Sequence, residues 1–318
     1  MTPAPEPIRV SAATTVVGVI GDPVDHSLSP LLHNTAFVEM GLDWVSVGFP
    51  VAAGQAQIAL AGMRALGIAG LSVTMPHKDA VAALVDRTTP VAARLGAVNC
   101  VTLDSGELVG SNTDGEGFVA SLRHGDRFEP RGKKCLVIGA GGAARAVVLA
   151  LAEAGAAEVI VVNRTESRAT LAAALAGPVG RVGRPEEAGT ADLVVNATPA
   201  GMGQPQGRGA GAEPGIVPTC DLGSDLGSDL GSDLGSDLGS DPFPLDAEYL
   251  VAGQMVVDLV YHPAVTPWLL AARERRAVTH NGLGMLVHQA AVQLRSWTGE
   301  EPPVAAMWQA ATAALGAR

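Results

Sequence analysis

Aromatic residues are scarce in this sequence. Only 3% of its 318 residues are Phe, Trp or Tyr, although 47% of all residues are hydrophobic. A core with so few rings is built from Ala, Val and Leu, and such small side chains suit helices that pack closely on buried parallel strands. The composition therefore predicts an α/β protein, and the length allows two domains.

Long apolar segments are also missing. No continuous apolar run reaches the roughly 20 residues that a membrane-spanning helix needs, and the opening MTPAPEPIRV contains no apolar signal core. Cysteines are few and odd in number, with no metal-like spacing among Cys100, Cys135 and Cys220. We therefore expect a soluble protein of the reducing cytoplasm that has no membrane partner.

Patterns for metals and for nucleic acids are absent too. The seven histidines form neither an HExxH motif nor a paired Cys/His spacing, so we expect no metal. The 21 Lys and Arg residues are outnumbered by 32 Asp and Glu residues, and they do not cluster. Because nucleic-acid binding needs concentrated positive charge, we expect no nucleic-acid partner.

A low-complexity repeat interrupts the second half of the chain. Residues 221–240 repeat the tetrapeptide DLGS, and the flanking sequences are rich in Gly and Pro. A helix of this period would carry one glycine per turn, at a cost of about 1 kcal/mol each relative to Ala, and would align aspartates that repel. The EF-hand calcium spacing and its closing Glu are absent. We interpret residues 204–243 as a solvated, mobile insertion.

Elsewhere, expected strands and helices alternate along the chain. A hairpin is expected around Ser105 and Gly106, and the pattern restarts near Lys133. Repeated βα units predict mainly parallel sheets with right-handed crossovers, and the restart predicts a second domain. The expected elements of the first half are strands at 14–21, 44–51 and 70–75 and helices at 30–40, 55–66, 77–86 and 116–123.

The restart carries a glycine motif. KKCLVIGAGGAAR reads as a strand, a turn and a helix, and it fits the pattern G-x-G-x-x-G/A. Glycines there permit a tight turn and let backbone amides approach a pyrophosphate at the helix N-terminus. A plain strand–helix turn is the alternative, but the next strand, EVIVV, is also in place. We predict a dinucleotide site at Gly139, Ala140, Gly141, Gly142 and Ala143.

The end of that next strand favours NADP over NAD. An NAD site usually has an acidic residue there for the ribose 2′-hydroxyl. This sequence instead has Asn163, Arg164 and Thr165, with Arg168 one turn further on. A guanidinium and a hydroxyl suit a 2′-phosphate, which a carboxylate would repel. Exposed basic residues without this role are the alternative interpretation.

Lys78 is an unusual residue for its position. In SVTMPHKD it stands where the chain is expected to leave a strand and begin a helix. A helix N-terminus carries partial positive charge, so a cation there costs a few tenths of a kcal/mol, up to about 1. Either Lys78 is an ordinary solvated side chain, or the fold tolerates it because chemistry needs it.

Nine motifs, in this order, resemble the shikimate dehydrogenase family. They are HSLSP (26–30), SVTMPHK (72–78), GAVN (96–99), NTDG (112–115), GAGGAAR (139–145), NRT (163–165), NATPAGM (196–202), DLVYHPAVTP (258–267) and NGLGMLVHQA (281–290). The match leaves out the short N-terminal tail and the Gly- and Asp-rich insertion.

The resemblance implies a fold and an activity. We expect an N-terminal α/β substrate domain, residues 10–113, completed by C-terminal helices in 282–318. A Rossmann-like NADP-binding domain with a doubly wound parallel sheet, residues 114–281, would lie between them. The implied reaction is the NADPH-dependent reduction of 3-dehydroshikimate to shikimate and its reverse, in aromatic amino acid (chorismate) biosynthesis. We expect a monomer or a homodimer.

The resemblance also implies roles for particular residues. Lys78 and Asp114 would form the catalytic pair, because an ammonium can stabilise and protonate the oxygen of a carbonyl that receives hydride. The implied substrate-binding residues are Ser27, Ser29, Thr74, Asn99, Tyr261 and Gln289. Thr198, Gly282 and Met285 would join the cofactor-binding residues named above.

Some of these roles have structural alternatives. Ser29 followed by Pro30 also suits a helix N-cap with proline at the first helical position, and Tyr261 could serve in packing. Ser72 stands where the family commonly has Asn, which keeps quinate or an aminated shikimate analogue open as substrates. A non-catalytic NADP-binding sensor on the same scaffold is a further alternative, although Lys78 and Asp114 are both present.

Overall fold

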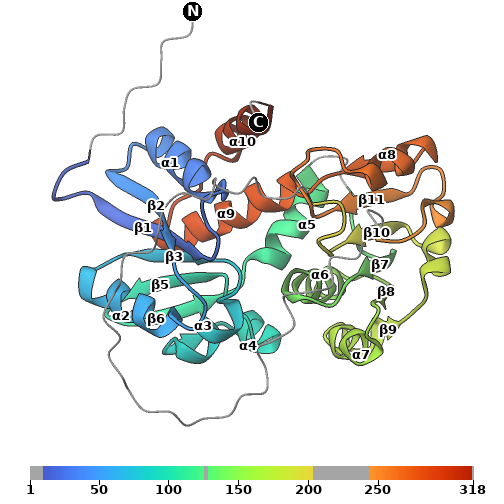
Figure 1. The fold of residues 1–318 in the computed structure, drawn as a ribbon, viewed down its shortest axis with the longest axis horizontal. Coiled ribbons are helices and arrows are strands. Elements are labelled where there is room, and N and C mark those ends of the chain that lie inside the picture. The colour runs from blue at the N-terminus through green and yellow to red at the C-terminus, as the bar shows by residue number, and fades with distance from the viewer. Residues whose placement is uncertain (1–9, 125–127, 203–243, 317–318) are drawn as a thin grey trace, which may run out of the picture.

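The computed structural model describes residues 10–124, 128–202 and 244–316, which form two six-stranded sheets joined by helices (Figure 1). The expected insertion at 204–243 lies outside the described residues. Within these three ranges no helix is both long and apolar enough to cross a membrane. The predicted two-domain α/β fold is confirmed.

The first sheet has the strand order β2-β1-β3-β5-β6-β4. β1 is parallel to β2 and β3, whereas β5 is antiparallel to β3 and β6, so the sheet is mixed. The expected hairpin joins β5 and β6 through Ser105 and Gly106, both with positive φ. The strands are β1 (Thr15–Gly21), β2 (Trp44–Pro50), β3 (Gly70–Val73), β4 (Arg87–Thr88), β5 (Cys100–Asp104) and β6 (Glu107–Ser111).

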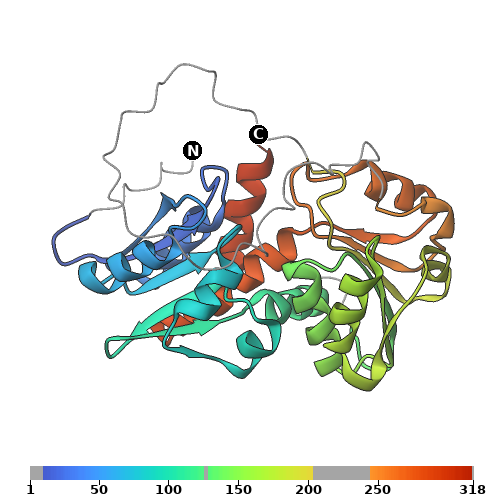
Figure 2. The ribbon, with the colours of Figure 1, turned by 60° about the horizontal axis from the view of Figure 1, so that its bottom comes forward.

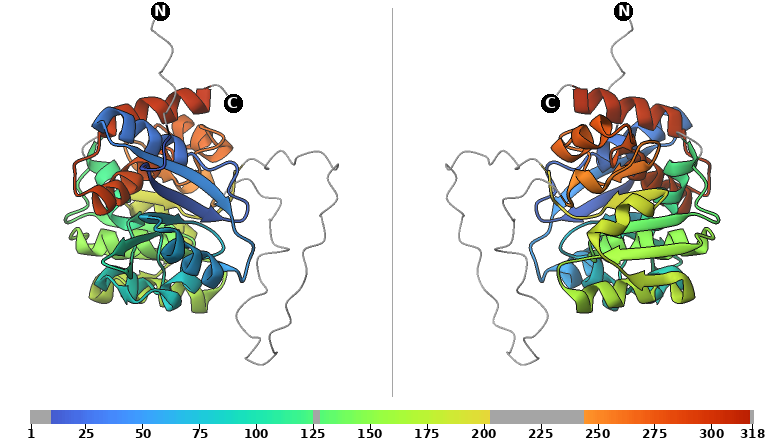
Figure 3. Two further views of the ribbon diagram at one scale, coloured as in Figure 1. Left: turned by 90° about the vertical axis from the view of Figure 1, so that its left-hand side faces the viewer. Right: turned by 90° about the vertical axis from the view of Figure 1, so that its right-hand side faces the viewer.

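The second sheet is entirely parallel and doubly wound, in the order β12-β11-β10-β7-β8-β9. Figure 3 shows the molecule from its two ends, with the first sheet in front on the left and the second in front on the right. Its strands are β7 (Lys134–Ile138), β8 (Glu158–Val162), β9 (Gly180–Val182), β10 (Leu193–Asn196), β11 (Met255–Asp258) and β12 (Val278–His280). The chain order reverses at β7, next to the glycine turn, where open parallel sheets bind ligands.

Helices cover both sheets. Those of the first half are α1 (Ser29–Met40), α2 (Ala56–Leu66), α3 (Lys78–Leu84), α4 (Pro90–Leu95) and α5 (Asp114–His124). The second sheet carries α6 (Gly142–Glu153), α7 (Glu166–Ala174) and α8 (Pro267–Glu274), with short 3-10 turns η1 (Gly177–Val179), η2 (Pro185–Thr190) and η3 (Ala247–Tyr249). The short β4, β9 and β12 and the single-turn segments were not predicted, because two to six residues carry too little periodicity.

The C-terminal helices return to the first sheet. α9 (Leu283–Thr298) and α10 (Val304–Gly316) share an apolar core with α1, and Val17 and Cys100 of the sheet belong to it. α5 and α9 lie together between the two sheets (Figures 1 and 2). α5 packs against α9, which belongs with the first sheet, and against α6, which belongs with the second. The predicted domain boundary at residues 113 and 114, at the start of α5, therefore stays a prediction.

A histidine is buried in the core between α1 and α9. His33 is fully buried, its Nδ1 lies 3.0 Å from Ser46 Oγ, and its ring meets Trp297 edge-on. Burial lowers the pKa of His33 from its usual 6.5 to about 3, and the neighbouring side chain of Gln293 partly opposes this shift. The imidazole is therefore neutral in the folded protein at neutral pH.

The folded protein should therefore lose stability in mild acid. Below pH 6.5 His33 is protonated in the unfolded chain, whereas in the folded chain it stays neutral down to about pH 3. The free energy of unfolding should fall by up to about 1.4 kcal/mol per pH unit from this residue alone. Urea unfolding between pH 7 and 4.5 measures the slope, and His33→Gln should make it shallower. Parallel slopes for both proteins would contradict the assignment.

Candidate active site

Lys78 and Asp114 meet between the two sheets. Lys78 begins α3 just after β3, and Asp114 begins α5. The Lys78 ammonium donates to Asp114 Oδ2 at 2.6 Å, and the two side chains are only 22% and 7% exposed. Asp114 is favourably placed at a helix N-terminus, whereas Lys78 is not. The carboxylate of Asp114 thus compensates for a cation that local helix energetics disfavours.

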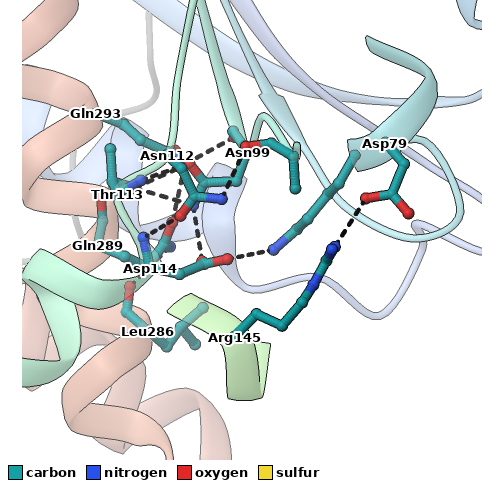
Figure 4. Close-up of polar contacts among 11 residues, drawn as sticks. Asp79, Asn99, Asn112, Thr113, Asp114, Arg145, Leu286, Gln289 and Gln293 are labelled. Atoms are coloured by element: carbon teal, nitrogen blue, oxygen red, sulfur yellow. Dashed lines mark hydrogen bonds and ion pairs between the residues drawn. The ribbon is translucent and has the colours of Figure 1, made fainter. Parts of the chain in front are cut away.

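A buried amide network holds the carboxylate in position. Asn99 Nδ2 donates to Asp114 Oδ1 at 2.7 Å and lies 3.0 Å from Thr113 Oγ1, while Asn99 Oδ1 accepts from the Thr113 amide at 2.8 Å. Asn112 Oδ1 accepts from the Asp114 amide at 3.2 Å. Figure 4 shows these contacts converging on Asp114. Both carboxylate oxygens are therefore engaged, which fixes the direction in which Lys78 is held.

Lys78 and Asp114, the predicted catalytic pair, line a pocket of about 240 Å³. It contains every residue predicted to bind substrate: Ser27, Ser29, Thr74, Asn99, Tyr261 and Gln289. Ala143, Gly282 and Met285, predicted for the cofactor, line the same pocket, as does Ser72. A larger hollow of about 690 Å³ between α4, α5 and α6 includes neither Lys78 nor Asp114. The smaller pocket is therefore the one that brings the predicted catalytic and substrate-binding residues together.

The sequence interpretation missed residues that position this site. Gln293 donates to Gln289 Oε1 at 2.9 Å and to the Asn99 carbonyl at 3.1 Å, and Gln289 donates to the Leu286 carbonyl at 2.9 Å. The i, i+4 spacing of the two glutamines on α9 is the signal that could have found Gln293. The positioning role of Thr113 had no signal in the sequence, because its hydroxyl donates to the carbonyl of Gln289, which is far away in the chain, at 3.1 Å.

The alternative role of Ser29 as a helix N-cap is wrong. The N-cap residue is Leu28, with helical φ and ψ, and no side chain caps the helix. Ser29 lies inside the first turn and is buried, and its amide donates to Ser27 Oγ at 3.2 Å. Proline occupies the second helical position, so the cap moves one residue toward the N-terminus. Ser29 is one of the residues that line the pocket.

The glycine turn between β7 and α6 leaves room for a pyrophosphate. Gly139 has a φ of +109°, and a Cβ there would lie 3.1 Å from the Ala197 carbonyl oxygen, so glycine is required. A Cβ on Gly141 or Gly142 would meet nothing within 4 Å. Gly141 is the N-cap of α6, and no side chain accepts from the first-turn amides. These open donors fit the phosphates of a dinucleotide.

The residues predicted to select NADP follow β8, at the same edge of the sheet. Asn163 donates to the Thr165 carbonyl at 3.0 Å, and Thr165 is the N-cap of α7. Arg164 and Arg168 are exposed around this turn. The turn presents two guanidinium groups and a hydroxyl where parallel strands β7 and β8 end together, which suits a phosphorylated ribose.

A buried carboxylate shapes the two loops that complete the cofactor side. Asp258, at the end of β11, accepts from Asn196 at 2.9 Å and from Thr266 at 2.7 Å. Burial raises the pKa of the Asp258 carboxyl, while these hydrogen bonds oppose the rise. Asn196 in turn accepts from the amide and hydroxyl of Thr198. The network holds Thr198 at the carboxyl edge of the sheet, and its role in cofactor binding stays a prediction.

Gly282 brings α9 against the end of β11. A Cβ at this position would lie 1.9 Å from the carbonyl oxygen of Leu259, so any larger residue would displace the backbone. The half-buried Met285 follows one turn later and lines the pocket beside Gly282. Among the described residues no group of three His, Cys, Asp or Glu could hold a metal ion.

Three family models match the chain. Residues 19–101 match the shikimate dehydrogenase substrate-binding domain, residues 124–200 match shikimate/quinate 5-dehydrogenase, and residues 282–312 match the shikimate 5′-dehydrogenase C-terminal domain. The first and third matches share one sheet and its returning helices, and the second covers the glycine turn.

Relatives and solved structures agree with these matches. Shikimate dehydrogenase (NADP(+)) of Moorella thermoacetica is 42% identical over 98% of this chain and 97% of that protein. The enzyme of the same name from Methanopyrus kandleri is 41% identical over 95% of this chain and 97% of its own length.

Among solved structures, shikimate 5-dehydrogenase of Thermus thermophilus in complex with NADP(H) and shikimate superposes with a TM-score of 0.79. It is 35% identical, over 95% of this chain and all of that one. Quinate dehydrogenase of Corynebacterium glutamicum in complex with NAD superposes with a TM-score of 0.77. It is 29% identical, over 94% of this chain and 99% of that one. With near-complete coverage at about 40% identity, this chain belongs to the shikimate dehydrogenase family.

Proposed function

We propose that this protein catalyses the NADPH-dependent reduction of 3-dehydroshikimate to shikimate, and its reverse, in aromatic amino acid biosynthesis. The observation that carries the proposal is the Lys78–Asp114 pair, which opens onto a polar pocket that also reaches the glycine turn of the second sheet. Family membership and the NADP(+)-dependent relatives support the same reaction and cofactor.

Lys78 acts on the oxygen of the reacting carbonyl. Gly139 to Ala143 would hold NADPH, which would supply the hydride and so place negative charge on the carbonyl oxygen. The Lys78 ammonium donates a hydrogen bond to this oxygen and transfers a proton to it. Asp114 holds the ammonium through its Oδ2, and Asn99 keeps Asp114 from rotating. In the reverse direction Lys78 accepts the proton of the substrate hydroxyl.

The other pocket residues bind and orient the substrate. Its carboxylate is met by the hydroxyls of Ser27 and Ser29 at the start of α1, whose helix dipole favours an anion there. Tyr261 also lines the pocket and supplies a phenolic hydroxyl to the same group. Thr74 and Gln289 provide compact donors and acceptors for the ring hydroxyls.

One assay tests the proposal. NADPH oxidation is followed by its ultraviolet absorbance with purified protein and 3-dehydroshikimate, with NADH in place of NADPH as the cofactor control. The reverse reaction is run with NADP+ and either shikimate or quinate. We expect turnover of 3-dehydroshikimate with NADPH and of shikimate with NADP+. A preference for quinate over shikimate would make quinate the substrate, the alternative that Ser72 keeps open. Absence of turnover despite NADPH binding would favour a sensor.

The cofactor preference should depend on Arg164. Its guanidinium is expected to grip the 2′-phosphate, so Arg164→Ala should weaken NADPH binding by about 1.5–3 kcal/mol, the range for a charge-assisted contact, and scarcely affect NADH. Isothermal titration calorimetry with both cofactors measures the difference. Arg87→Ala, which removes an exposed arginine of the first sheet, is the matched control. Equal losses for NADPH and NADH would mean that Arg164 supports structure only.

Two expectations about the whole protein remain predictions within this proposal. The protein works as a monomer or a homodimer, and its site is complete within one chain, because all the pocket residues named above come from it. It works in the reducing cytoplasm, where Cys100 and Cys135 stay as buried thiols.

A further inference from the structure

Two buried polar atoms behind the pocket have no hydrogen-bond partner among the described residues. They are His33 Nε2 on α1 and Gln293 Oε1 on α9, and both residues are 0% exposed. His33 meets Trp297 edge-on, and Trp297 lies one helical turn beyond Gln293 on α9. Because residues i and i+4 share a face of a helix, His33 lies beside Gln293 as well. An unpaired buried donor or acceptor is costly, so these two neighbouring atoms need an explanation.

The amide of Gln293 has only one favourable orientation. Its Nε2 lies 3.1 Å from the carbonyl oxygen of Asn99, which can only accept, and 2.9 Å from Gln289 Oε1. Both hydrogens of Nε2 are therefore used, and Oε1 is left as an acceptor without a donor. The side chain of Gln293 raises the pKa of His33 against the effect of burial, which is the direction expected for an oxygen beside the imidazole.

The neutral imidazole of His33 has one proton to place. Its Nδ1 lies 3.0 Å from Ser46 Oγ, and a hydroxyl can either donate or accept. A proton on Nδ1 would turn the lone pair of Nε2 toward the lone pairs of Gln293 Oε1, and both atoms would stay unpaired. A proton on Nε2 supplies a donor to Gln293 Oε1, and the Ser46 hydroxyl then donates to Nδ1. The second tautomer therefore accounts for both buried atoms.

The same series of side chains sets the orientation of Gln289 in the pocket. Gln289 Oε1 accepts from Gln293, and Gln289 Nε2 donates one hydrogen to the Leu286 carbonyl at 2.9 Å. The second hydrogen of Nε2 has no partner among the described residues, and Gln289 lines the pocket. Figure 4 shows Gln289 and Gln293 beside the network around Asp114. Gln289 thus offers the pocket a nitrogen donor.

We propose that His33 is a positioning residue for the substrate, because its Nε2–H holds Gln293 and so keeps the amide nitrogen of Gln289 available to the pocket. The substrate group that meets Gln289 is then an oxygen that accepts, either a hydroxyl or a carbonyl. Neither His33 nor Gln293 lines the pocket, so both act through Gln289. The consequence for substrate binding rests on the proposed function, whereas the tautomer of His33 does not.

Nitrogen NMR measures the tautomer directly. Long-range ¹H–¹⁵N spectra of protein labelled with ¹⁵N-histidine distinguish a protonated ring nitrogen from an unprotonated one. The spectrum of His33→Gln identifies the signals of His33 among the seven histidines. We expect wild-type His33 at pH 7 to carry its proton on Nε2. A proton on Nδ1 would overturn the proposal, whatever the activity of the protein.

Kinetics tests the role in substrate binding. His33→Phe keeps a ring against Trp297 and removes the donor, so it should raise the KM for 3-dehydroshikimate about two- to tenfold. The kcat should change much less, because Gln289 is expected to contact a part of the substrate that does not react. His33→Gln places an amide nitrogen near the position of Nε2 and should restore the KM. His33→Asn is equally polar but too short, and it should not.

The contrast between these variants separates positioning from packing. A wild-type KM in His33→Phe would overturn the positioning role, and so would equal rises in His33→Gln and His33→Asn, which would reflect lost packing alone. If His33→Phe fails to fold in thermal unfolding, the comparison of Gln with Asn gives the same test. Gln293→Leu should raise the KM at least as much, and adding His33→Phe should cause no further rise. Effects that multiply would contradict the proposal.

The two measurements also separate this proposal from the proposed function. A wild-type protein that lacks activity on 3-dehydroshikimate, yet has His33 protonated on Nε2, would refute the proposed function and support the arrangement of His33 and Gln293. An active protein with His33 protonated on Nδ1 would support the function and overturn the arrangement.

Discussion

Lys78→Met should lower turnover of 3-dehydroshikimate by about 10²–10⁴-fold, the range for a positioned acid or electrostatic donor. Methionine keeps most of the apolar stem and removes the charge. Because the ammonium mainly stabilises negative charge that develops as hydride arrives, substrate affinity should change much less than turnover. Steady-state kinetics with NADPH in excess separates the two quantities.

The fold should survive this substitution. Removing a cation from the N-terminus of α3 relieves a small penalty, and Asp114 keeps its hydrogen bond from Asn99. Lys133→Met, at an exposed lysine paired with Asp192, is the matched control and should retain full turnover. Circular dichroism and thermal unfolding check both variants.

Asp114→Asn extends the test to the partner. It removes the carboxylate that holds the ammonium at 2.6 Å, so it should also impair turnover. The double variant with Lys78→Met should lose less than the sum of the two single effects if the residues act as one unit. A Lys78→Met protein with full turnover would show that the Lys78–Asp114 pair serves the structure and not the reaction.

Gly117→Ala should destabilise the protein by about 1–3 kcal/mol, the usual cost of inserting a methyl group into a packed contact. Gly117 lies in α5, and a Cβ there would come 2.5 Å from the backbone nitrogen of Gln289 in α9. Backbone atoms cannot turn aside as a flexible side chain can, so the two helices must separate. Urea unfolding measures the loss, which should outweigh the helix-propensity gain of alanine.

The same substitution should disturb the site. α9 carries Gln289 into the pocket, and Gln293 and Thr113 are tied to that segment. The KM for 3-dehydroshikimate should therefore rise together with the loss of stability. Gly62→Ala is the control, because Gly62 lies within α2 and a Cβ there meets nothing within 4 Å. The free energy of unfolding of Gly62→Ala should rise by about 0.5–1 kcal/mol. A similar rise for Gly117→Ala would contradict the close contact between α5 and α9.

Local patterns in the sequence were enough for the fold class and the cofactor turn. A buried strand, a glycine turn and an Ala-rich helix are contiguous in residues 134–153, and each is favoured by its own composition. The predicted helices of the first half agree with the structure within two residues at each end, and the hairpin at Ser105 and Gly106 is confirmed. These features form from interactions between near neighbours in the chain.

Local patterns misled where a neighbour in space had the stronger effect. Ser29 before Pro30 suggests a helix cap, yet the helix begins at Ser29, and this residue lines the pocket. The sequence predicted the hairpin that contains β5, but not that β5 would pair antiparallel with β3. Packing against the rest of the sheet decides such details, and it outweighs single-residue preferences of about 1 kcal/mol.

The sequence by itself determined two α/β units, a dinucleotide turn, and a lysine that local helix energetics disfavours. Only the tertiary structure decided what that lysine meets, because Asp114 lies 36 residues away and reaches Lys78 through the start of another helix. The same holds for Gln293, which supports Asn99 from 194 residues away. Short-range preferences act along the chain, whereas a buried charge is stabilised by whichever groups the fold brings within hydrogen-bonding distance.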